Sequence, residues 1–171
     1  MIAAVVLIGA PGAGKSAVLD ALAMLLEQNG VEHGAIESEE LTRGFPPLPN
    51  AALLEQLAAV VDRQLGAGRR LFLVAFTAES DAELRAVLAV TGAQRTLVVC
   101  LRAPADVLAE RVQEREPDAW PGKPALIAHA RALAGEVPAL DGIDLVLDTG
   151  ARDADDLARA VLAAMRERRI V

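Results

Sequence analysis

Short apolar runs alternate with amphipathic segments along most of the chain. A continuous run of aliphatic and β-branched residues is typical of a parallel strand that is buried on both faces. Four such runs are present, at residues 2–8, 70–76, 95–101 and 143–147. Residues 31–36 form a shorter candidate strand that ends at Glu37.

Apolar positions at helical spacing predict helices between these strands. The expected helices cover about 15–28, 50–66, 81–91, 104–115, 124–135 and 153–168. Asn50 is the expected cap of the second helix, and Pro104 opens the fourth. Residues 44–50 (GFPPLPN) are predicted to be a loop because their prolines lack N–H donors. Residues 116–124 (EPDAWPGKP) break the periodicity and are predicted to form a short lid.

Alternating strands and helices predict βαβ units joined by right-handed crossovers, and therefore a parallel sheet. The expected fold class is α/β, with helices on both faces of the sheet in three layers. The length of 171 residues fits one domain, residues 1–171, and no internal repeat or long linker interrupts it.

Composition narrows the range of partners. The net charge of −7 argues against a nucleic-acid backbone as the main partner. The apolar opening segment MIAAVVLIGA is too short to span a bilayer and lacks a basic region before it, so we expect no membrane partner and a cytoplasmic location. The single cysteine, Cys100, lies in an apolar run and is expected to pack in the core. Oligomeric state stays open, because 53% hydrophobic residues leave room for a homodimer interface among alanine-rich helices.

The strongest motif follows the first predicted strand, where Gly9–Ser16 reads GAPGAGKS. It matches the phosphate-binding loop G-x-x-x-x-G-K-[ST], with a strand before it and a helix after it as that motif requires. Small residues let the loop turn tightly enough to aim backbone N–H groups at phosphates, and the helix N-terminus adds positive potential. The sequence therefore predicts a P-loop fold that binds a nucleoside triphosphate.

The expected cofactors are ATP and Mg²⁺. Lys15 is predicted to reach the β- and γ-phosphates, and the Ser16 hydroxyl is predicted to ligate Mg²⁺. GTP stays open, although no N/T-K-x-D guanine signature is present. The predicted nucleotide-binding residues are Gly9, Ala10, Pro11, Gly12, Ala13, Gly14, Lys15, Ser16, Ala17 and Arg111.

With these motifs the chain resembles the small P-loop kinases, which include shikimate, gluconate, adenylylsulfate and chloramphenicol phosphotransferase-type kinases. The resemblance covers nearly the whole length. It is carried by GAPGAGKS, by Glu37 at the end of the second strand, by LRAPADVLAERVQER before the lid, and by DLVLDTG near the end. It implies a five-stranded parallel sheet in the order 2-3-1-4-5 and a lid that closes over ATP.

The resemblance also implies a catalytic base. In these kinases a carboxylate at the end of strand two accepts the proton of the acceptor hydroxyl, and Glu37 holds that position here, with Glu39 and Glu40 close behind. Ligands of open α/β sheets gather at the carboxyl ends of the strands, which supports the placement independently. The alternative is a solvated acidic loop or a helix start that favours acidic residues.

Two arginines before the lid are the next candidates. Arg111 and Arg115 lie four residues apart and share a helical face. The resemblance implies that such arginines contact the transferring phosphates or stack on the base; the alternative is surface ion pairing with Glu110 or Glu114. Arg102, at the end of the fourth strand, is a weaker candidate of the same kind.

The third strand departs from the usual P-loop pattern, because it ends in FTAES without the aspartate that lies near Mg²⁺. Glu79 either replaces that aspartate through a water or starts the helix at residue 81. Asp148 fits the missing motif by pattern alone, but its position matches the adenine-side loop of the resembling kinases, where 148–152 would lie at the edge of the base.

His33 and His129 are isolated in the sequence and are expected at the surface. Trp120 either covers a ligand or fills the core of the lid.

These observations favour an ATP-dependent kinase that acts on a hydroxyl of an unidentified small molecule. The alternative is a nucleotide-binding regulatory or accessory P-loop protein with little turnover, which would account for the missing aspartate.

Overall fold

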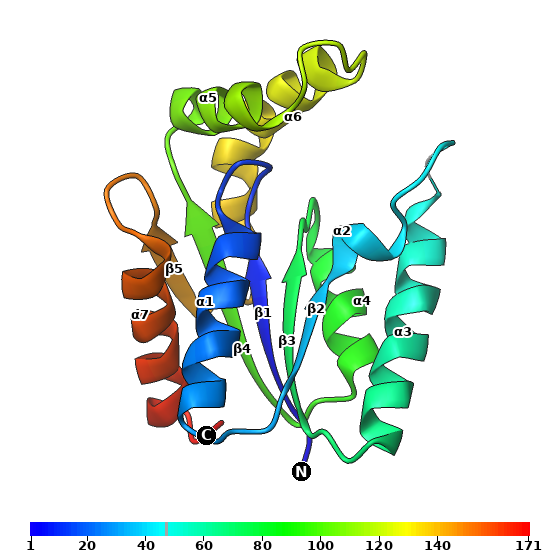
Figure 1. Cartoon of the computed structure of the whole chain (residues 1–171), viewed down its shortest axis with the longest axis vertical. Coiled ribbons are helices and arrows are strands. Elements are labelled where there is room, and N and C mark those ends of the chain that lie inside the picture. Colours follow the sequence, from blue (N-terminus) through cyan, green and yellow to red (C-terminus); the bar gives the residue numbers. More distant parts are fainter. Residues whose placement is uncertain (47) are drawn as a thin grey trace.

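The computed structural model describes residues 1–46 and 48–171, apart from the side chain of Asn50. Its centre is a five-stranded, wholly parallel sheet in the order β2-β3-β1-β4-β5 (Figure 1). The strands are β1 (Ala3–Ile8), β2 (Gly34–Glu37), β3 (Leu71–Phe76), β4 (Arg95–Arg102) and β5 (Leu145–Asp148). The predicted fold class and strand order are confirmed.

The central strand β1 is buried along its whole length. All six of its residues are buried, and it pairs with both neighbours, so that Val6 lies beside Val74 on β3 and Val98 on β4. A strand covered on both faces needs apolar residues at every position rather than at alternate ones. Cys100 on β4 is fully buried as expected, and burial raises the pKa of its thiol to about 11.

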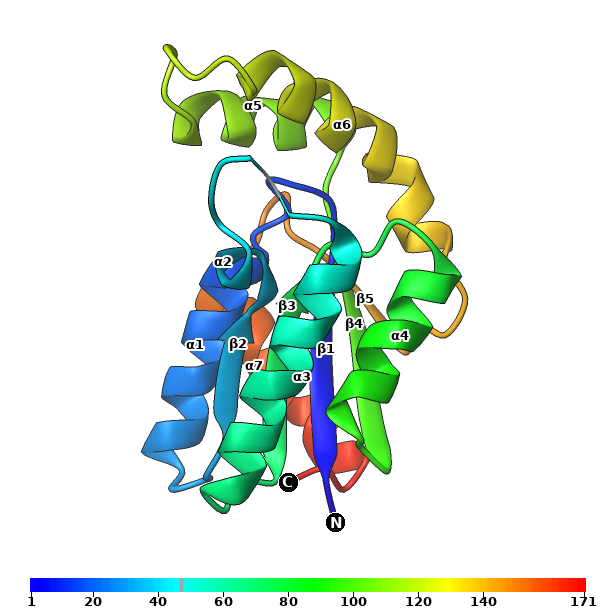
Figure 2. The ribbon, with the colours of Figure 1, turned by 90° about the vertical axis from the view of Figure 1, so that its right-hand side faces the viewer.

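Helices cover both faces of the sheet. They are α1 (Lys15–Gln28), α2 (Ser38–Leu41), α3 (Asn50–Gly66), α4 (Asp81–Thr91), α5 (Ala105–Arg115), α6 (Lys123–Glu136) and α7 (Ala154–Glu167), with a 3₁₀ turn at Val137–Ala139. Helices α1 and α7 pack together on one face, and α3 and α4 on the other (Figures 1 and 2). No helix in the described residues is both long and apolar enough to cross a bilayer.

Helices α5 and α6 form a hairpin that stands above the carboxyl ends of the strands, and we call residues 105–136 the arm (Figure 2). Its connection is shorter than the predicted lid 116–124, because α6 begins at Lys123; Pro124 is tolerated in the first helical turn. The buried Lys123 ammonium donates to the carbonyl of Glu116 at 2.7 Å and pairs with Asp118 at 2.7 Å. Lys123 therefore links the start of α6 to the residues that follow α5.

Three smaller expectations need correction, and one alternative is supported. Asn50 is the first residue of α3 rather than its cap, and Pro49 occupies the cap position. Strand β2 begins at Gly34, so residues 31–33 lie outside it, and Asp148 is the last residue of β5 rather than part of the following loop. The acidic residues after Glu37 form the one-turn helix α2, which agrees with the helix-start alternative.

Ser80 provides a test of local folding at the β3–α4 junction. Its hydroxyl caps α4 by accepting from the N–H of Glu83 at 3.2 Å. We expect Ser80→Ala to lower the free energy of unfolding by about 1 kcal/mol, because an orphan N–H of the helix loses its acceptor. Urea denaturation measures this loss. Ser80→Asp keeps an acceptor and should stay close to wild type; an equal loss in both variants would contradict the capping role.

Candidate functional site

The P-loop lies between β1 and α1, and its glycines are required by the backbone. Gly12 has φ +83° and Gly14 has φ +92°, in the left-handed region that side chains disfavour. A Cβ atom on Gly12 would lie only 2.6 Å from the carbonyl oxygen of Leu108 in α5. The loop can therefore pass beneath the arm only with glycine at this position.

The beginning of α1 offers unused donors to a ligand. The first helical hydrogen bond runs from the N–H of Val18 to the carbonyl of Gly14 at 3.0 Å, so the N–H groups of residues 15–17 precede it. They adjoin a cavity of about 290 Å³. Its lining residues are Pro11, Gly12, Gly14, Lys15, Ser16, Ala17, Glu39, Arg111 and Arg115. Free donors, a helix N-terminus and cationic side chains together fit a polyphosphate.

The Lys15 ammonium is buried over the loop. It donates to the carbonyl of Gly9 at 3.0 Å and lies 3.7 Å from a carboxylate oxygen of Glu39. Burial lowers the pKa of Lys15, although the nearby carboxylates of Glu39 and Glu37 partly offset this effect. A cation so poorly solvated gains strongly from an anionic ligand.

Glu39 approaches Lys15 because Thr77 holds it there. The Thr77 hydroxyl donates to the Glu39 carboxylate at 2.6 Å. Burial raises the pKa of Glu39, but Lys15, this hydrogen bond and Arg115 together lower it below the usual value. The carboxylate beside the P-loop therefore comes from α2, whereas the usual P-loop pattern supplies it from the third strand. The sequence signal for this contact was the polar residue directly after β3, in FTAES.

Glu37 ends β2 as expected, and its carboxylate has no partner. Both of its oxygens are buried without a hydrogen bond in the described residues, as is the hydroxyl of Ser38. Burial raises the pKa of Glu37; the nearby Ser16 hydroxyl opposes the shift without reaching hydrogen-bond geometry. A carboxylate with a raised pKa accepts a proton more readily than an ordinary one.

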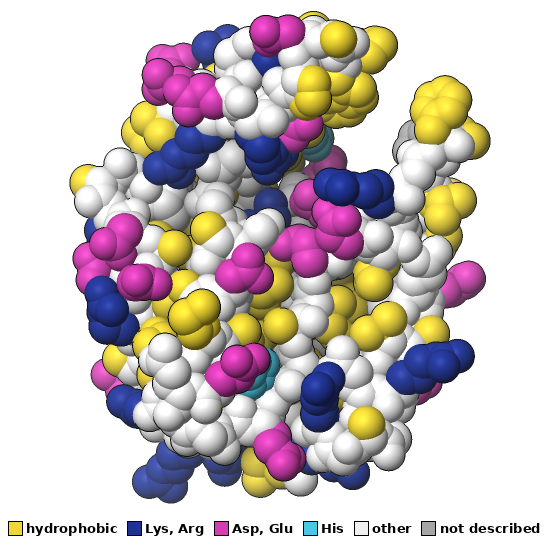
Figure 3. All heavy atoms as spheres, in the orientation of Figure 1, with side chains coloured by type: hydrophobic (Ala, Val, Ile, Leu, Met, Phe, Trp, Pro, Cys, Tyr) yellow, Lys and Arg dark blue, Asp and Glu magenta, His cyan; other side chains and the backbone are white. Residues whose placement is uncertain are grey.

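A second cavity, of about 570 Å³, adjoins the first. Its lining residues are Ser16, Glu37, Glu39, Glu40, Thr42, Arg43, Gly44, Arg115, Glu116 and Leu126. The two cavities share Ser16, Glu39 and Arg115. Figure 3 shows basic and acidic side chains facing one another in the hollow beneath the arm. A group in the first cavity and a group in the second would therefore lie side by side.

The two predicted arginines have different surroundings. Arg111 donates to the carbonyl of Thr149 at 2.7 Å, to the Thr149 hydroxyl at 3.0 Å and to the carbonyl of Gly12 at 3.3 Å. Arg115 donates to Glu116 at 2.7 Å and lines both cavities. Neither makes a hydrogen bond to Glu110 or Glu114 in the described residues; the half-exposed Arg115 forms its ion pair with Glu116 instead. The sequence did not predict the contact of Arg111 with Thr149.

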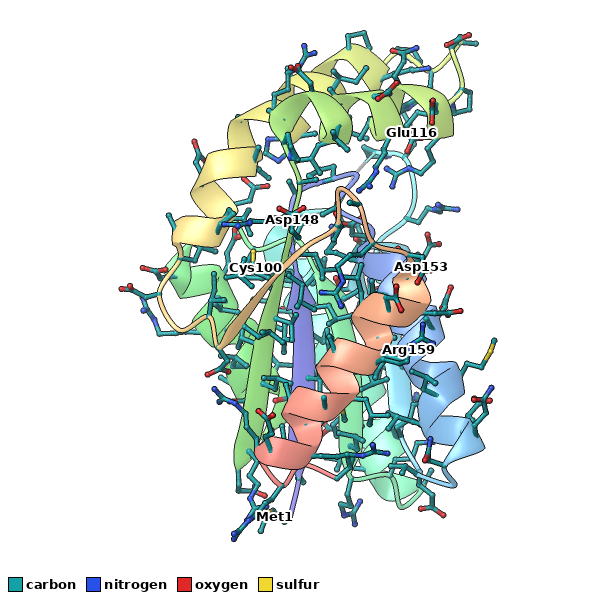
Figure 4. The ribbon with its side chains drawn as sticks, turned by 90° about the vertical axis from the view of Figure 1, so that its left-hand side faces the viewer. Met1, Cys100, Glu116, Asp148, Asp153 and Arg159 are labelled. Atoms are coloured by element: carbon teal, nitrogen blue, oxygen red, sulfur yellow. The ribbon has the colours of Figure 1, made fainter. Side chains whose placement is uncertain are left out.

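The other candidates lie outside these two cavities. Glu79 is not among the lining residues of either cavity, and it pairs with His129 of α6 at 2.9 Å. The His129 side chain is 40% exposed, as expected of a surface residue. Arg102 and Asp148 lie beside each other at the ends of β4 and β5, 3.8 Å apart. Figure 4 shows Asp148 below the arm, whereas Glu116 lies on the arm itself. The structure therefore does not bring Glu79 together with Ser16.

A bound Mg²⁺ is compatible with this site. The described residues contain no cluster of three or more His, Cys, Asp or Glu side chains arranged around a metal. The Ser16 hydroxyl and the unpartnered carboxylate of Glu37 line one cavity, and both are oxygen donors that Mg²⁺ accepts. The cation would therefore be held by Ser16 together with phosphate and water oxygens rather than by a protein cage.

Comparison with known proteins agrees with this architecture. The family model described as an AAA domain matches residues 5–134. No curated protein matches the sequence significantly.

Solved structures share the fold at low sequence identity. A sugar kinase from Janibacter sp. HTCC2649 is 20% identical with a TM-score of 0.68, over 97% of this chain and 95% of that one. The APS kinase of Mycobacterium tuberculosis, in complex with AMPPNP and APS, is 19% identical with a TM-score of 0.67, over 96% and 98%. A gluconokinase from Sinorhizobium meliloti 1021 is 24% identical with a TM-score of 0.66, over 96% and 92%. The resemblance to small P-loop kinases is thereby confirmed at the level of the fold.

The unpartnered carboxylate of Glu37 predicts a pH-dependent stability. Its pKa in the folded protein lies above the usual 4.5, so near this pH the folded state binds more protons than the unfolded state. The folded protein therefore loses stability as pH rises from 4.5 through the raised pKa. Glu37→Gln removes this loss. We expect the variant to be more stable than wild type at pH 7 by about 1 kcal/mol, with the difference vanishing below pH ~4.

Urea denaturation of wild type and Glu37→Gln across this pH range measures the difference. Glu40→Gln is the matched control, because the Glu40 carboxylate is exposed and already paired with Arg43 at 2.9 Å. A Glu37→Gln variant less stable than wild type at pH 7 would show that the attraction of Lys15 outweighs the burial of the carboxylate.

Proposed function

The chain belongs to the AAA domain family, and we propose that it is an ATP-dependent phosphotransferase that phosphorylates a hydroxyl group of a small molecule. One observation carries the proposal: the phosphate-binding cavity and the cavity that contains Glu37 share Ser16, Glu39 and Arg115. This arrangement supports transfer between two bound molecules, because it provides a polyphosphate site and, beside it, a space for an acceptor next to a candidate base.

The P-loop and Lys15 would hold the triphosphate. The Lys15 ammonium, now turned toward the Gly9 carbonyl and Glu39, would exchange these partners for phosphate oxygens. Mg²⁺, when bound, neutralises charge on the β- and γ-phosphates, and the Ser16 hydroxyl is the group of this chain that would hold it.

Glu37 would act as the general base. Its carboxylate accepts the proton of the acceptor hydroxyl while the hydroxyl oxygen forms a bond to the γ-phosphorus. The bond from that phosphorus to the β,γ-bridging oxygen breaks, and ADP leaves with the electron pair. The buried, unpartnered state of Glu37 supports this role, since no other group of the described chain competes for its oxygens.

Arg115 and Arg111 would serve as clamps in different ways. Arg115 lines both cavities, so it is placed to neutralise charge on the group in transfer. Arg111 already holds the carbonyls of Gly12 and Thr149, so it would fix the arm against the P-loop and the β5–α7 loop.

Structural neighbours support the same class of reaction. They are described as a sugar kinase, a gluconokinase and an APS kinase, the last in complex with AMPPNP and APS. Their low identity to this chain carries no information on its acceptor.

A nucleotide-binding regulatory module with little turnover is the second candidate. One observation favours it: in the described part of the chain no carboxylate that follows β3 lies beside the P-loop, and Glu79 pairs instead with His129. A kinase consumes ATP faster in the presence of an acceptor, whereas a module of this kind does not.

Nucleotide binding is the first test. Titration calorimetry with ATP and Mg²⁺ should give micromolar binding to wild type, and we expect Lys15→Met to weaken it about tenfold to a hundredfold, because a charge-assisted contact is lost. Arg85→Met removes the same charge from an exposed position on α4 and should bind like wild type. Titration with GTP establishes base preference. A wild type that binds neither nucleotide would exclude the kinase.

Catalysis by Glu37 is tested separately. With the hydroxyl compound that most increases ADP formation in a screen, we expect Glu37→Gln to reduce kcat about a hundredfold or more, because proton acceptance is lost. ATP binding should be retained, and Glu55→Gln, an exposed change on α3, should leave kcat unaltered. An unchanged kcat in Glu37→Gln would remove Glu37 from the reaction.

A further inference from the structure

The cavity beside the phosphate-binding loop has a net charge that selects among acceptors. We infer that the acceptor carries a positively charged amino group in addition to the hydroxyl that is phosphorylated. This inference rests on the proposed function and narrows it to a substrate class: amino alcohols, amino sugars and aminocyclitols.

Carboxylates outnumber cations on the cavity wall. Among its lining residues the acidic ones are Glu37, Glu39, Glu40 and Glu116, and the basic ones are Arg43 and Arg115. Among the described lining residues Leu126 is the only large apolar side chain, so the space suits a polar molecule. Lys15 of the neighbouring cavity lies 3.7 Å from Glu39 and offsets its charge, so the wall keeps one negative charge in excess. This excess attracts a cation and repels an anion.

Both arginines are already engaged. Arg43 pairs with Glu40 at 2.9 Å, and the Nε of Arg115 donates to Glu116 at 2.7 Å. An anionic acceptor would compete with Glu40 and Glu116 for these guanidinium groups, and it would face the Glu37 carboxylate, which makes no hydrogen bond in the described residues. A cationic acceptor meets no such competition.

Glu116 is the best-placed partner for an ammonium group. Only 22% of its side chain is exposed, and within the described residues its carboxylate contacts only Arg115. Glu116 also follows the last turn of α5, where the carbonyl ends of the helix add negative potential. Two independent features, a half-engaged carboxylate and a helix C-terminus, therefore favour a cation at the arm side of the cavity.

Glu37 sets the orientation of the acceptor. It ends β2 on the sheet side of the cavity, and Ser16 beside it opens onto the phosphate cavity. The reacting hydroxyl would lie at this end and the ammonium group toward Glu116. The wall thus fits a molecule with a hydroxyl and an amine at opposite ends.

The test compares acceptors that differ in charge. Two matched series are glucosamine, glucose and glucuronate, and ethanolamine, ethylene glycol and glycolate. Each compound is titrated into wild-type protein saturated with Mg²⁺ and a non-hydrolysable ATP analogue. In at least one series we expect the amine to bind about tenfold more tightly than the neutral compound, and the carboxylate most weakly. The inference is overturned if in neither series the amine binds more tightly than the others.

The variant Glu116→Gln tests whether the Glu116 carboxylate causes the preference for an amine. The variant removes the carboxylate and also releases Arg115, so the ratio of amine to carboxylate affinity should fall about tenfold. Glu114→Gln makes the same charge change two residues earlier, outside the cavity, and should keep the wild-type ratio. An unchanged ratio in Glu116→Gln would remove Glu116 from recognition.

The initial saturation with the ATP analogue distinguishes the two proposals. Failure to bind the analogue contradicts the kinase. Binding of the analogue without a charge preference among acceptors contradicts only the inference of an amine-containing acceptor.

Discussion

The contact between the P-loop and the arm determines how the rest of the site is built. Gly12 passes so close to the carbonyl of Leu108 that no side chain fits between them, and Arg111 of the arm donates to the carbonyl of the same glycine. The phosphate cavity lies between the P-loop and the arm, and Arg115 of the arm lines both this cavity and the second one. A tight backbone crossing at one glycine therefore places the arm over the loop and creates both spaces.

The charges in the site are arranged at the expense of stability. Lys15 is buried with incomplete compensation, and Glu37 is buried without a hydrogen bond. Groups of this kind usually destabilise a folded protein, so their presence in one place is typical of a site that awaits a ligand. The opposite signs of the two groups limit the penalty, because each lies in the field of the other.

The sequence predicted those parts of the structure that follow from local pattern. Strands buried on both faces, such as β1, have no polar position, and the glycines of the P-loop follow from the turn that they make. The position of Glu37 could be predicted because it depends on where one strand ends. The sequence could not predict that Thr77 orients Glu39, or that Arg111 reaches Thr149, because residues 38 positions apart meet only through the strand order. The closure of the lid connection by Lys123 was missed for another reason: a lysine in an irregular segment is usually solvated.

The internal bonding of that connection has a mechanical consequence. Lys123 ties the carbonyl of Glu116 to the start of α6, so the end of one helix, the turn and the beginning of the next form one rigid corner. These bonds couple the tip of the arm to both of its helices. We therefore expect the arm to approach a bound molecule by a rotation of the whole hairpin about its attachment near residues 102–105. Small adjustments at the P-loop, where Gly12 and Arg111 meet, would be amplified along the length of α5 into larger displacements at Glu116.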